Sequence, residues 1–207
     1  SISMPPASAP AYFLPYGTLF RMTEHTREKM MLTREQNELV TRTGPGTAMG
    51  DLFRCYWLPI LLSEELPEPD CAPVRVKVLS ERLIAFRDSE GKLGLIDEFC
   101  PHRGASLWFA RNEECGLRCP YHGWKFDVTG KVVETPNYND AKYRDRLKAP
   151  SFPVHEEGGL VWAYVGPKEH QPELSRFAFM DARPEHRVVL RIRVSCNYLQ
   201  LVEGGQD

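Results

Sequence analysis

The hydrophobic and polar positions of the chain take on a period of two near Val74. From Val74 to Leu79 valine alternates with arginine and lysine, which is typical of a strand with one buried face. Similar short runs, separated by turn residues, continue to Val165 and predict a small antiparallel β unit. The expected strands are 74–79, 83–87, 93–99, 117–119, 124–128, 131–134 and 160–165.

The residues before this unit predict helices and an arm. Thr33-Arg34-Glu35-Gln36 has the form of a capping box, which predicts a short helix through Val40 that ends near Gly44. Residues 51–57 predict a second helical turn. Residues 1–30 are rich in proline at their start and show little periodicity, so we expect an extended arm.

A domain boundary is expected at Gly166-Pro167, where a charged stretch begins. Beyond it, Arg187–Val194 predicts a strand, and Ser195 is the expected N-cap of a helix that runs towards Val202. The chain is thus expected to divide into an arm (1–30), a helical segment (31–73), the β domain (74–166) and the start of a further domain (167–207).

Two Cys-His pairs in the β unit give the strongest chemical signal. Cys100 and His102 are spaced C-x-H, and Cys119 and His122 are spaced C-x-x-H. Thiolate and imidazole ligands favour zinc or iron–sulfur over hard ions. A zinc finger usually offers two Cys and then two His, whereas here each pair supplies one of each. This arrangement suits two sulfide-bridged irons, one held by both Cys and the other by both His, which is the ligand set of a Rieske [2Fe–2S] centre. A structural zinc site, or buried thiols and packed histidines that meet by coincidence, are the alternatives.

The residues around the pairs resemble those of the Rieske family. Cys100–Ala105 resembles its first cluster loop and Cys119–Trp124 its second. The glycine in each loop lets the backbone turn tightly and present N–H groups to the cluster sulfides. The resemblance implies that both cysteines ligate one iron and both histidines the other.

The same loops distinguish classes within the family. Respiratory members carry a disulfide between the loops, and the matching positions here are Ala105 and Tyr121, which cannot form it. Those members also place a serine where this chain has Trp124, and its hydroxyl donates to a cluster sulfide. Fewer hydrogen bonds to the cluster predict a low reduction potential. The centre resembles those of ring-hydroxylating oxygenases and their ferredoxins.

Composition excludes several classes. The net charge of −2 gives no argument for nucleic acid or anionic membranes. No apolar run approaches the roughly 20 residues of a membrane span, and the first residues lack the order of a secretory signal. Six cysteines in 207 residues do not make a disulfide scaffold. We therefore expect a cytoplasmic protein with neither nucleic-acid nor membrane partners.

The other cysteines and histidines are not expected to bind metal. The remaining cysteines are expected to be reduced and mostly buried, and the remaining histidines to be solvated or hydrogen-bonded. These residues are Cys55, Cys71, Cys115, Cys196, His25, His155, His170 and His186.

The two ends of the chain extend the resemblance. Residues 31–59 resemble the start of phthalate-dioxygenase-type oxygenase α subunits, and Asn197–Asp207 resembles the opening of the catalytic domain in Rieske non-haem iron oxygenases. This implies a mainly β fold followed by an α+β helix-grip domain in a longer parent protein. In that family, two His and one carboxylate hold a mononuclear Fe(II) in the second domain. In that family the acid that matches Asp207 bridges a Rieske His of one subunit to an iron ligand of the next, so Asp207 is the expected inter-subunit electron-transfer bridge.

The resemblance implies a terminal oxygenase component. A flavin and iron–sulfur reductase would bring electrons from NAD(P)H, and Fe(II) would use O₂ to hydroxylate a phthalate- or benzoate-like aromatic substrate. A homotrimer or hexamer is expected, and the fragment alone is expected to lack the complete active site. A Rieske ferredoxin and a Rieske monooxygenase or demethylase remain the alternative functions.

Overall fold

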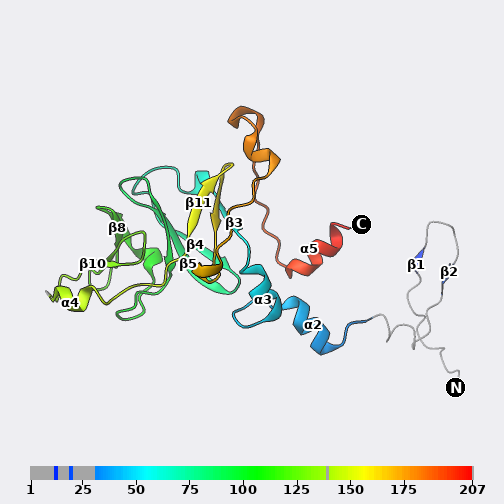
Figure 1. Cartoon of the computed structure of the whole chain (residues 1–207), viewed down its shortest axis with the longest axis horizontal. Coiled ribbons are helices and arrows are strands. Elements are labelled where there is room, and N and C mark those ends of the chain that lie inside the picture. The colour runs from blue at the N-terminus through cyan, green and yellow to red at the C-terminus, as the bar shows by residue number, and fades with distance from the viewer. Residues whose placement is uncertain (1–11, 14–18, 21–30, 139, 207) are drawn as a thin grey trace, which may run out of the picture. The chain divides into compact units, whose positions relative to one another are not determined.

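An antiparallel β domain makes up most of the computed structural model that follows residue 40 (Figure 1). The structure describes residues 12–13, 19–20, 31–138 and 140–206. Residues 1–40 and 41–207 form two separate units. In the first unit, β1 (Tyr12–Phe13) and β2 (Leu19–Phe20) pair antiparallel, and the rest of the predicted arm 1–30 lies outside the described residues.

The β domain consists of small antiparallel sheets. Their strand orders are β4-β5-β6, β11-β12-β3 and β10-β9-β8-β7. The strands are β3 (Leu58–Leu62), β4 (Val74–Val78), β5 (Glu81–Arg87), β6 (Leu93–Asp97), β7 (Arg111–Glu113), β8 (Gly116–Arg118), β9 (Lys125–Phe126), β10 (Val132–Glu134), β11 (Val154–Glu157) and β12 (Leu160–Ala163).

The described helices are short. They are α2 (Arg34–Thr41), α3 (Ala48–Phe53), α4 (Ala141–Arg144) and α5 (Tyr198–Gly204), with 3-10 turns at Ser63–Glu65, Leu107–Phe109, Lys168–His170, Ala178–Asp181 and Pro184–His186. The predicted capping box of α2 is confirmed, because the Thr33 N–H donates to Gln36 Oε1 at 2.9 Å and the Gln36 N–H donates to Thr33 Oγ1 at 3.2 Å. The predicted start of the next helix at residue 51 is wrong: Thr47 Oγ1 caps the Gly50 N–H, so α3 begins at Ala48.

Strand β5 lies between two hydrophobic cores. Ile84 and Phe86 pack into core 1 on one face, and Leu83 and Ala85 pack into core 2 on the other. All four are almost completely buried. Successive side chains of a strand point to opposite faces, so an unbroken apolar run is the pattern of a strand covered on both sides. Core 1 also contains Cys100 and Cys119, and thus β5 supports the side of the domain that carries the Cys-His pairs.

The predicted strand ranges between residues 74 and 165 all overlap observed strands. β3, β7 and β11 were not predicted. β3 contains Pro59, and β7 and β11 are largely polar. Because β3 pairs with β12 along its length, the β structure begins before residue 74.

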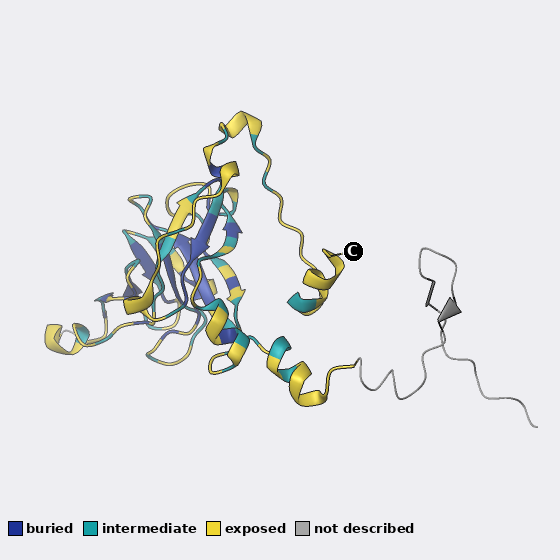
Figure 2. Cartoon of the chain, turned by 45° about the vertical axis from the view of Figure 1, so that its right-hand side comes forward, coloured by how far each residue is buried: buried dark blue, intermediate teal, exposed yellow. Residues whose placement is uncertain are grey.

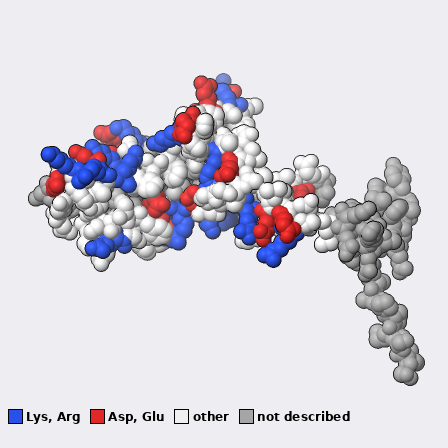
Figure 3. Space-filling view, turned by 60° about the horizontal axis from the view of Figure 1, so that its bottom comes forward, with Lys and Arg blue, Asp and Glu red and all other residues white. Residues whose placement is uncertain are grey.

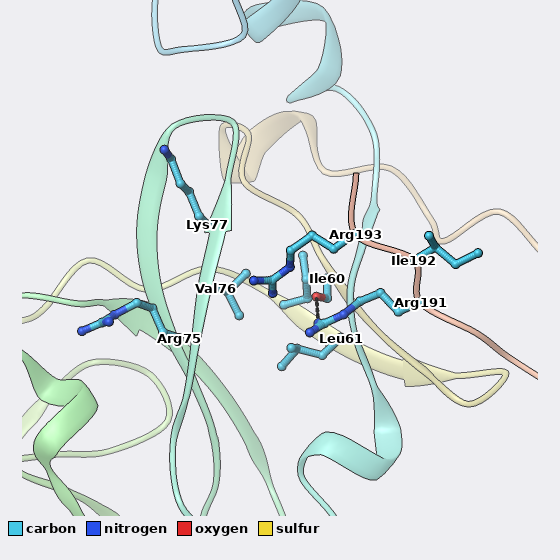
Figure 4. Close-up of a pocket in the computed structure, with 8 residues that line it drawn as sticks. All are labelled: Ile60, Leu61, Arg75, Val76, Lys77, Arg191, Ile192 and Arg193. Carbon is cyan, nitrogen blue, oxygen red and sulfur yellow. Dashed lines mark hydrogen bonds between the residues drawn. The ribbon is translucent and has the colours of Figure 1, made fainter. Parts of the chain in front are cut away.

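The strand predicted at 187–194 is wrong. Among the described residues, this segment forms no backbone ladder with a strand, although residues 187–190 alternate between intermediate and exposed. Arg191 and Arg193 reach from it towards β3 and β4 (Figure 4). The Arg191 guanidinium donates to the Ile60 carbonyl at 3.4 Å and pairs with Glu65 at 2.8 Å. The alternate, exposed side chains are Val188, Leu190, Ile192 and Val194.

The helix expected after this segment is present, but its N-cap is not Ser195. Asn197 Oδ1 accepts a hydrogen bond from the Leu199 N–H at 3.0 Å, so α5 begins at Tyr198. The Asn197 side-chain amide also donates to the Thr41 carbonyl at 2.9 Å.

Burial follows the strands rather than the helices. Figure 2 shows dark blue, buried residues concentrated on the sheets, whereas the helices are mainly exposed or intermediate. Within the described part of the chain, every helix is too short or too polar to cross a lipid bilayer.

The two-core arrangement predicts a specific pattern of additivity. Ile84 and Ile96 are directly paired across β5 and β6 and share core 1, whereas Leu83 is the chain neighbour of Ile84 but belongs to core 2. Each single change to Ala should lower the free energy of unfolding by about 2–5 kcal/mol. Ile84→Ala with Ile96→Ala should deviate from additivity by about 0.5–3 kcal/mol, and Ile84→Ala with Leu83→Ala should be additive within about 0.5 kcal/mol. Urea titrations of the three single and two double variants measure this, and equal coupling in both pairs would contradict the two cores.

Candidate metal centre

The four predicted ligands lie on two loops that have matching backbone geometry. Loop 1 (residues 100–106) follows β6, and loop 2 (residues 119–124) connects β8 to β9. In loop 1 the first Cys N–H donates to the Ala105 carbonyl at 2.9 Å, and its own carbonyl accepts from Gly104 at 2.8 Å. In loop 2 the equivalent bonds join Cys119 to Trp124 at 2.8 Å and to Gly123 at 3.1 Å. Both glycines have φ near +70°, the left-handed conformation that the sequence predicted for these turns.

The side chains of the two loops meet. Cys100 and Cys119 are buried in core 1, each 3% exposed, and their thiols hydrogen-bond to each other. His102 and His122 are half-buried, and their ring centroids are 4.6 Å apart. The structure therefore places two sulfur ligands on the inner side of the site and two nitrogen ligands on its outer side.

The thiol pair is poised for metal binding. The hydrogen bond from Cys100, together with backbone N–H groups of Tyr121 and His122 and against the effect of burial, lowers the pKa of Cys119 to about 6. The pKa of Cys100 is raised, because its proton bridges to Cys119 and because it is buried. The thiolate is the form that ligates metal, so lowering the pKa of Cys119 favours metal binding, which displaces the proton of Cys100.

The imidazoles are suited to the same task. Burial lowers the pKa of His102, and His122 and Arg103 lower it further by repulsion between positive charges. A neutral imidazole has a free nitrogen lone pair for a metal. The Trp124 indole stacks on the His102 ring, with centroids 4.4 Å apart and planes 3° from parallel, which fixes the orientation of that ligand.

A buried carboxylate anchors loop 1. Glu98 is fully buried two residues before Cys100. It accepts hydrogen bonds from Ser106 Oγ at 2.7 Å, Arg82 Nε at 3.0 Å and Arg75 Nε at 2.9 Å. Burial disfavours the charged carboxylate, but these three donors outweigh it and hold the pKa of Glu98 below its usual value. The start and end of loop 1 are thereby tied to β4 and β5.

A second charged cluster anchors loop 2. Arg118, directly before Cys119, donates to the Gly123 carbonyl at 3.2 Å and pairs with Glu113 at 2.5 Å and Glu134 at 2.8 Å. These carboxylates raise the pKa of Arg118. The buried Lys125 also pairs with Glu134. Loop 2 is thus fixed from both of its ends to the β7-β8-β9-β10 sheet.

The roles of Glu98 and Arg118 as loop anchors were not predicted from the sequence. Glu98 and Arg118 stand beside the ligands in the sequence, but their partners are distant, with 16 and 23 residues separating Glu98 from Arg82 and Arg75. For Glu98 the signal was a pair of acidic residues, Asp97 and Glu98, at the end of the otherwise apolar run Leu93–Phe99. The sequence also treated Trp124 only as a position without a hydroxyl, whereas the structure makes it a support for His102.

The other candidates have different outcomes. The four cysteines outside the loops form no disulfide, as predicted, but the expectation that they are mostly buried is wrong: Cys55 and Cys196 are exposed, and Cys71 and Cys115 are intermediate. His155 lies 3.7 Å from Glu157. The following predicted residues lie outside the described part of the chain: His25 and Asp207.

The donor set fits the cluster that the sequence implies. Two buried sulfurs that face two neighbouring imidazoles supply both ligand types from one concave site, and the two loops are held rigidly against separate sheets. A cavity of about 400 Å³ opens beside His102 and is lined by His102, Trp124, Asn137, Tyr138 and Tyr143. The histidine side therefore faces an open, uncharged hollow, while the cysteine side is enclosed.

Comparison with known proteins agrees with this geometry. Residues 56–153 match the family model described as the Rieske [2Fe-2S] domain. The chain is 42% identical over 178 residues to the phthalate 4,5-dioxygenase oxygenase subunit of Pseudomonas putida, which covers 86% of this chain and 40% of that protein. It is 44% identical over 180 residues to the 3-chlorobenzoate-3,4-dioxygenase oxygenase subunit of Comamonas testosteroni. This match covers 86% of this chain and 41% of that protein.

Solved structures give the same result. The terminal oxygenase of carbazole 1,9a-dioxygenase from Novosphingobium sp. KA1 matches with a TM-score of 0.58 and 29% identity, over 72% of this chain and 39% of that chain. Dicamba monooxygenase with non-heme iron and dicamba matches with a TM-score of 0.53 and 32% identity, over 58% of this chain and 36% of that chain. The chain spans about 40% of the length of the curated relatives it matches.

The ligand set predicts which substitutions abolish metal binding. Cys100→Ser and His122→Ala should each lose the two irons and two acid-labile sulfides and destabilise the loops, because a bound metal centre contributes folding free energy. Cys71→Ser, at a free and partly exposed thiol, is the matched control and should keep both. Iron and sulfide analysis after anaerobic purification measures this, and bound zinc without sulfide would contradict the assignment.

Trp124 predicts the redox behaviour. Because the indole offers no hydroxyl to a sulfide, the midpoint potential should lie at the low end of the Rieske range, near about −150 mV, and Ala105 and Tyr121 make it insensitive to disulfide reductants. Trp124→Ser should raise the potential if its hydroxyl reaches a sulfide, whereas Trp124→Phe, which keeps a ring over His102, should change it little. Protein-film voltammetry reports these values, and a clearly positive midpoint for the unsubstituted chain would contradict the hydrogen-bond argument.

Proposed function

Because residues 56–153 match the Rieske [2Fe-2S] domain and most of the chain is similar to dioxygenase oxygenase subunits, we propose that it is the electron-relaying part of a terminal oxygenase component of the Rieske family. In the complete protein a mononuclear Fe(II) would use O₂ to hydroxylate an aromatic substrate. The observation that carries the proposal is the convergence of two buried thiols and two neighbouring imidazoles on anchored loops. The cluster they would hold accepts and releases one electron at a time.

The cysteine side and the histidine side of the site have different roles in electron transfer. Core 1 excludes water from Cys100 and Cys119, and a dry, rigid surrounding limits reorganisation when the charge of the site changes. His102 and His122 are partly exposed, so electrons would enter or leave the cluster through these two imidazoles. Trp124 holds one imidazole in a fixed plane during this exchange.

We propose that the hollow beside His102 receives the next redox site. It is lined by aromatic and amide side chains and has room for a side chain from a neighbouring subunit. In this proposal Asp207 bridges a Rieske histidine of one subunit to an iron ligand of the next, and the protein forms a homotrimer or a hexamer. NAD(P)H and flavin would act through a separate iron–sulfur reductase, which also favours a location in the cytoplasm.

The relatives suggest a substrate class. Two of them are named for phthalate and 3-chlorobenzoate, which are aromatic carboxylates. On this basis we propose a phthalate- or benzoate-like substrate. The chain is also 39% identical to the 5,5'-dehydrodivanillate O-demethylase oxygenase subunit of Sphingobium sp. and resembles dicamba monooxygenase, so a monooxygenase or demethylase is the second candidate.

A Rieske ferredoxin is the weaker alternative. The similarity to oxygenase subunits extends over 178 residues, whereas the Rieske domain itself matches only residues 56–153. Segments on both sides of the domain are therefore shared with oxygenase subunits, which an isolated electron carrier does not require.

The proposed role of Asp207 predicts a separation of two activities. In the complete protein, Asp207→Asn should leave the visible spectrum of the cluster nearly unchanged, because this residue is not a ligand. Product formation should fall by orders of magnitude, because the carboxylate no longer orients the two imidazoles that it joins. If Asp207 only ends a helix, the cost is about 1 kcal/mol of stability and little activity. Single-turnover kinetics with phthalate or 3-chlorobenzoate distinguish these cases, and cluster oxidation at the unsubstituted rate with product formed would leave Asp207 structural.

A further inference from the structure

An exposed group of aromatic and arginine side chains lies beside loop 1. Phe99, Trp108 and Phe109 are 38%, 43% and 65% exposed. The Arg82 guanidinium lies 4.5 Å from the centroid of the Phe99 ring, and the Arg75 guanidinium lies 4.5 Å from that of Trp108. We refer to these five residues as the loop-1 patch.

The loop-1 patch is held in place from beneath. The buried Glu98 carboxylate pairs with Arg75 at 2.7 Å and with Arg82 at 3.0 Å, while the two arginine side chains stay 43% and 54% exposed. Long side chains usually lose rotamer freedom when a partner binds. Here the buried carboxylate has already fixed both guanidiniums, and each guanidinium in turn lies against one ring.

The loop-1 patch carries positive charge. Two arginines face a single buried carboxylate, and Arg103 of loop 1 is exposed as well. Figure 3 shows basic and acidic side chains intermixed in small groups over the face that it presents. The positive charge of the loop-1 patch is therefore a local feature. The hollow beside His102 contrasts with this patch, because no Lys, Arg, Asp or Glu lines it.

The position of the loop-1 patch links it to electron transfer. Phe99 directly precedes Cys100, and its backbone pairs with Ser106 at the base of loop 1. A protein seated on these side chains would therefore contact the same loop that carries two of the four metal ligands. Arginine and aromatic residues are also the types that contribute most binding energy at protein interfaces.

We propose that the loop-1 patch is the docking surface for the acidic face around the iron–sulfur group of the electron-donor protein. This inference rests on the proposed function and names the partner surface of the same site. Docking at this cationic patch leaves the uncharged hollow beside His102 free for the acceptor. The donor and the acceptor would therefore contact different residues of the chain.

The test uses the cluster-loaded full chain and a reduced plant-type [2Fe–2S] ferredoxin, a small acidic one-electron carrier, as the probe. Stopped-flow absorbance gives the second-order rate constant for cluster reduction at several salt concentrations. For Trp108→Ala combined with Phe109→Glu, which leaves both arginines that pair with Glu98 in place, the rate constant at low salt should fall about tenfold or more. Its decrease with salt should become shallower, because the added carboxylate offsets the positive charge of the patch. Dithionite, which needs no docking surface, should reduce the variant and the unsubstituted chain at the same rate.

A matched control makes the same two kinds of change at a pair of exposed aromatic residues elsewhere, Phe177 and Phe179. Phe179 lies against Gly158 in the turn between β11 and β12. This turn is near the end of β5 where Arg87 pairs with Glu156, opposite to the end that carries Arg82. Phe177→Ala combined with Phe179→Glu should leave the ferredoxin rate constant unchanged.

The outcomes separate this proposal from the proposed function. Unchanged reduction of the loop-1 variant by ferredoxin, or an equal loss in the control, overturns the docking surface and leaves the cluster function standing. A change in midpoint potential large enough to explain the slower reduction also overturns it. A lower sedimentation coefficient in the loop-1 variant assigns the patch to contact between copies of the chain instead. Failure of the unsubstituted chain to bind a cluster overturns the proposed function itself.

Discussion

The charged groups at the bases of the two ligand loops are the constraint on which the site depends. Loop 1 begins after a fully buried carboxylate, and loop 2 begins after a guanidinium that pairs with carboxylates of its own sheet. A buried charge is costly unless hydrogen bonds and opposite charges surround it. Glu98 and Arg118 meet this requirement with partners on other strands, so the loops are fixed where the strands are fixed. Loss of the arginines that pair with Glu98, or of the carboxylates that pair with Arg118, would leave a largely buried charge unpaired beside a ligand cysteine.

The two hydrophobic cores explain why such a short chain positions the loops well. β5 is covered on both faces, and only one face contacts the ligand cysteines. Core 2 joins the β4-β5-β6 sheet to the β11-β12-β3 sheet and contains no ligand. Core 1 joins it to the β7-β8-β9-β10 sheet and contains both thiols. The metal centre is therefore built on one face of a strand that the other face stabilises independently.

Local features of the sequence were sufficient for the ligands and for most strands. The Cys-His spacing and the loop glycines are contained within a few residues, and the structure brings them together as predicted. Features that depend on distant partners could not be predicted in this way. β3 contains a proline and becomes a strand because β12 pairs with it. Glu98 resembles any acidic residue until its partners on β4 and β5 are known. The alternating segment at 187–194 shows the reverse error, since alternation without a neighbouring strand does not make a sheet.

Histidine ligation of one iron is the central claim, and it can be measured directly. The chain would be produced with ¹⁵N-labelled histidine, loaded with its cluster, reduced by one electron and examined by pulsed electron paramagnetic resonance. Ligation by His102 and His122 predicts couplings from two histidine nitrogens, and substitution of either residue should remove the signal of an intact site. A reduced cluster that shows no histidine nitrogen coupling would have cysteine ligands alone and would contradict the account.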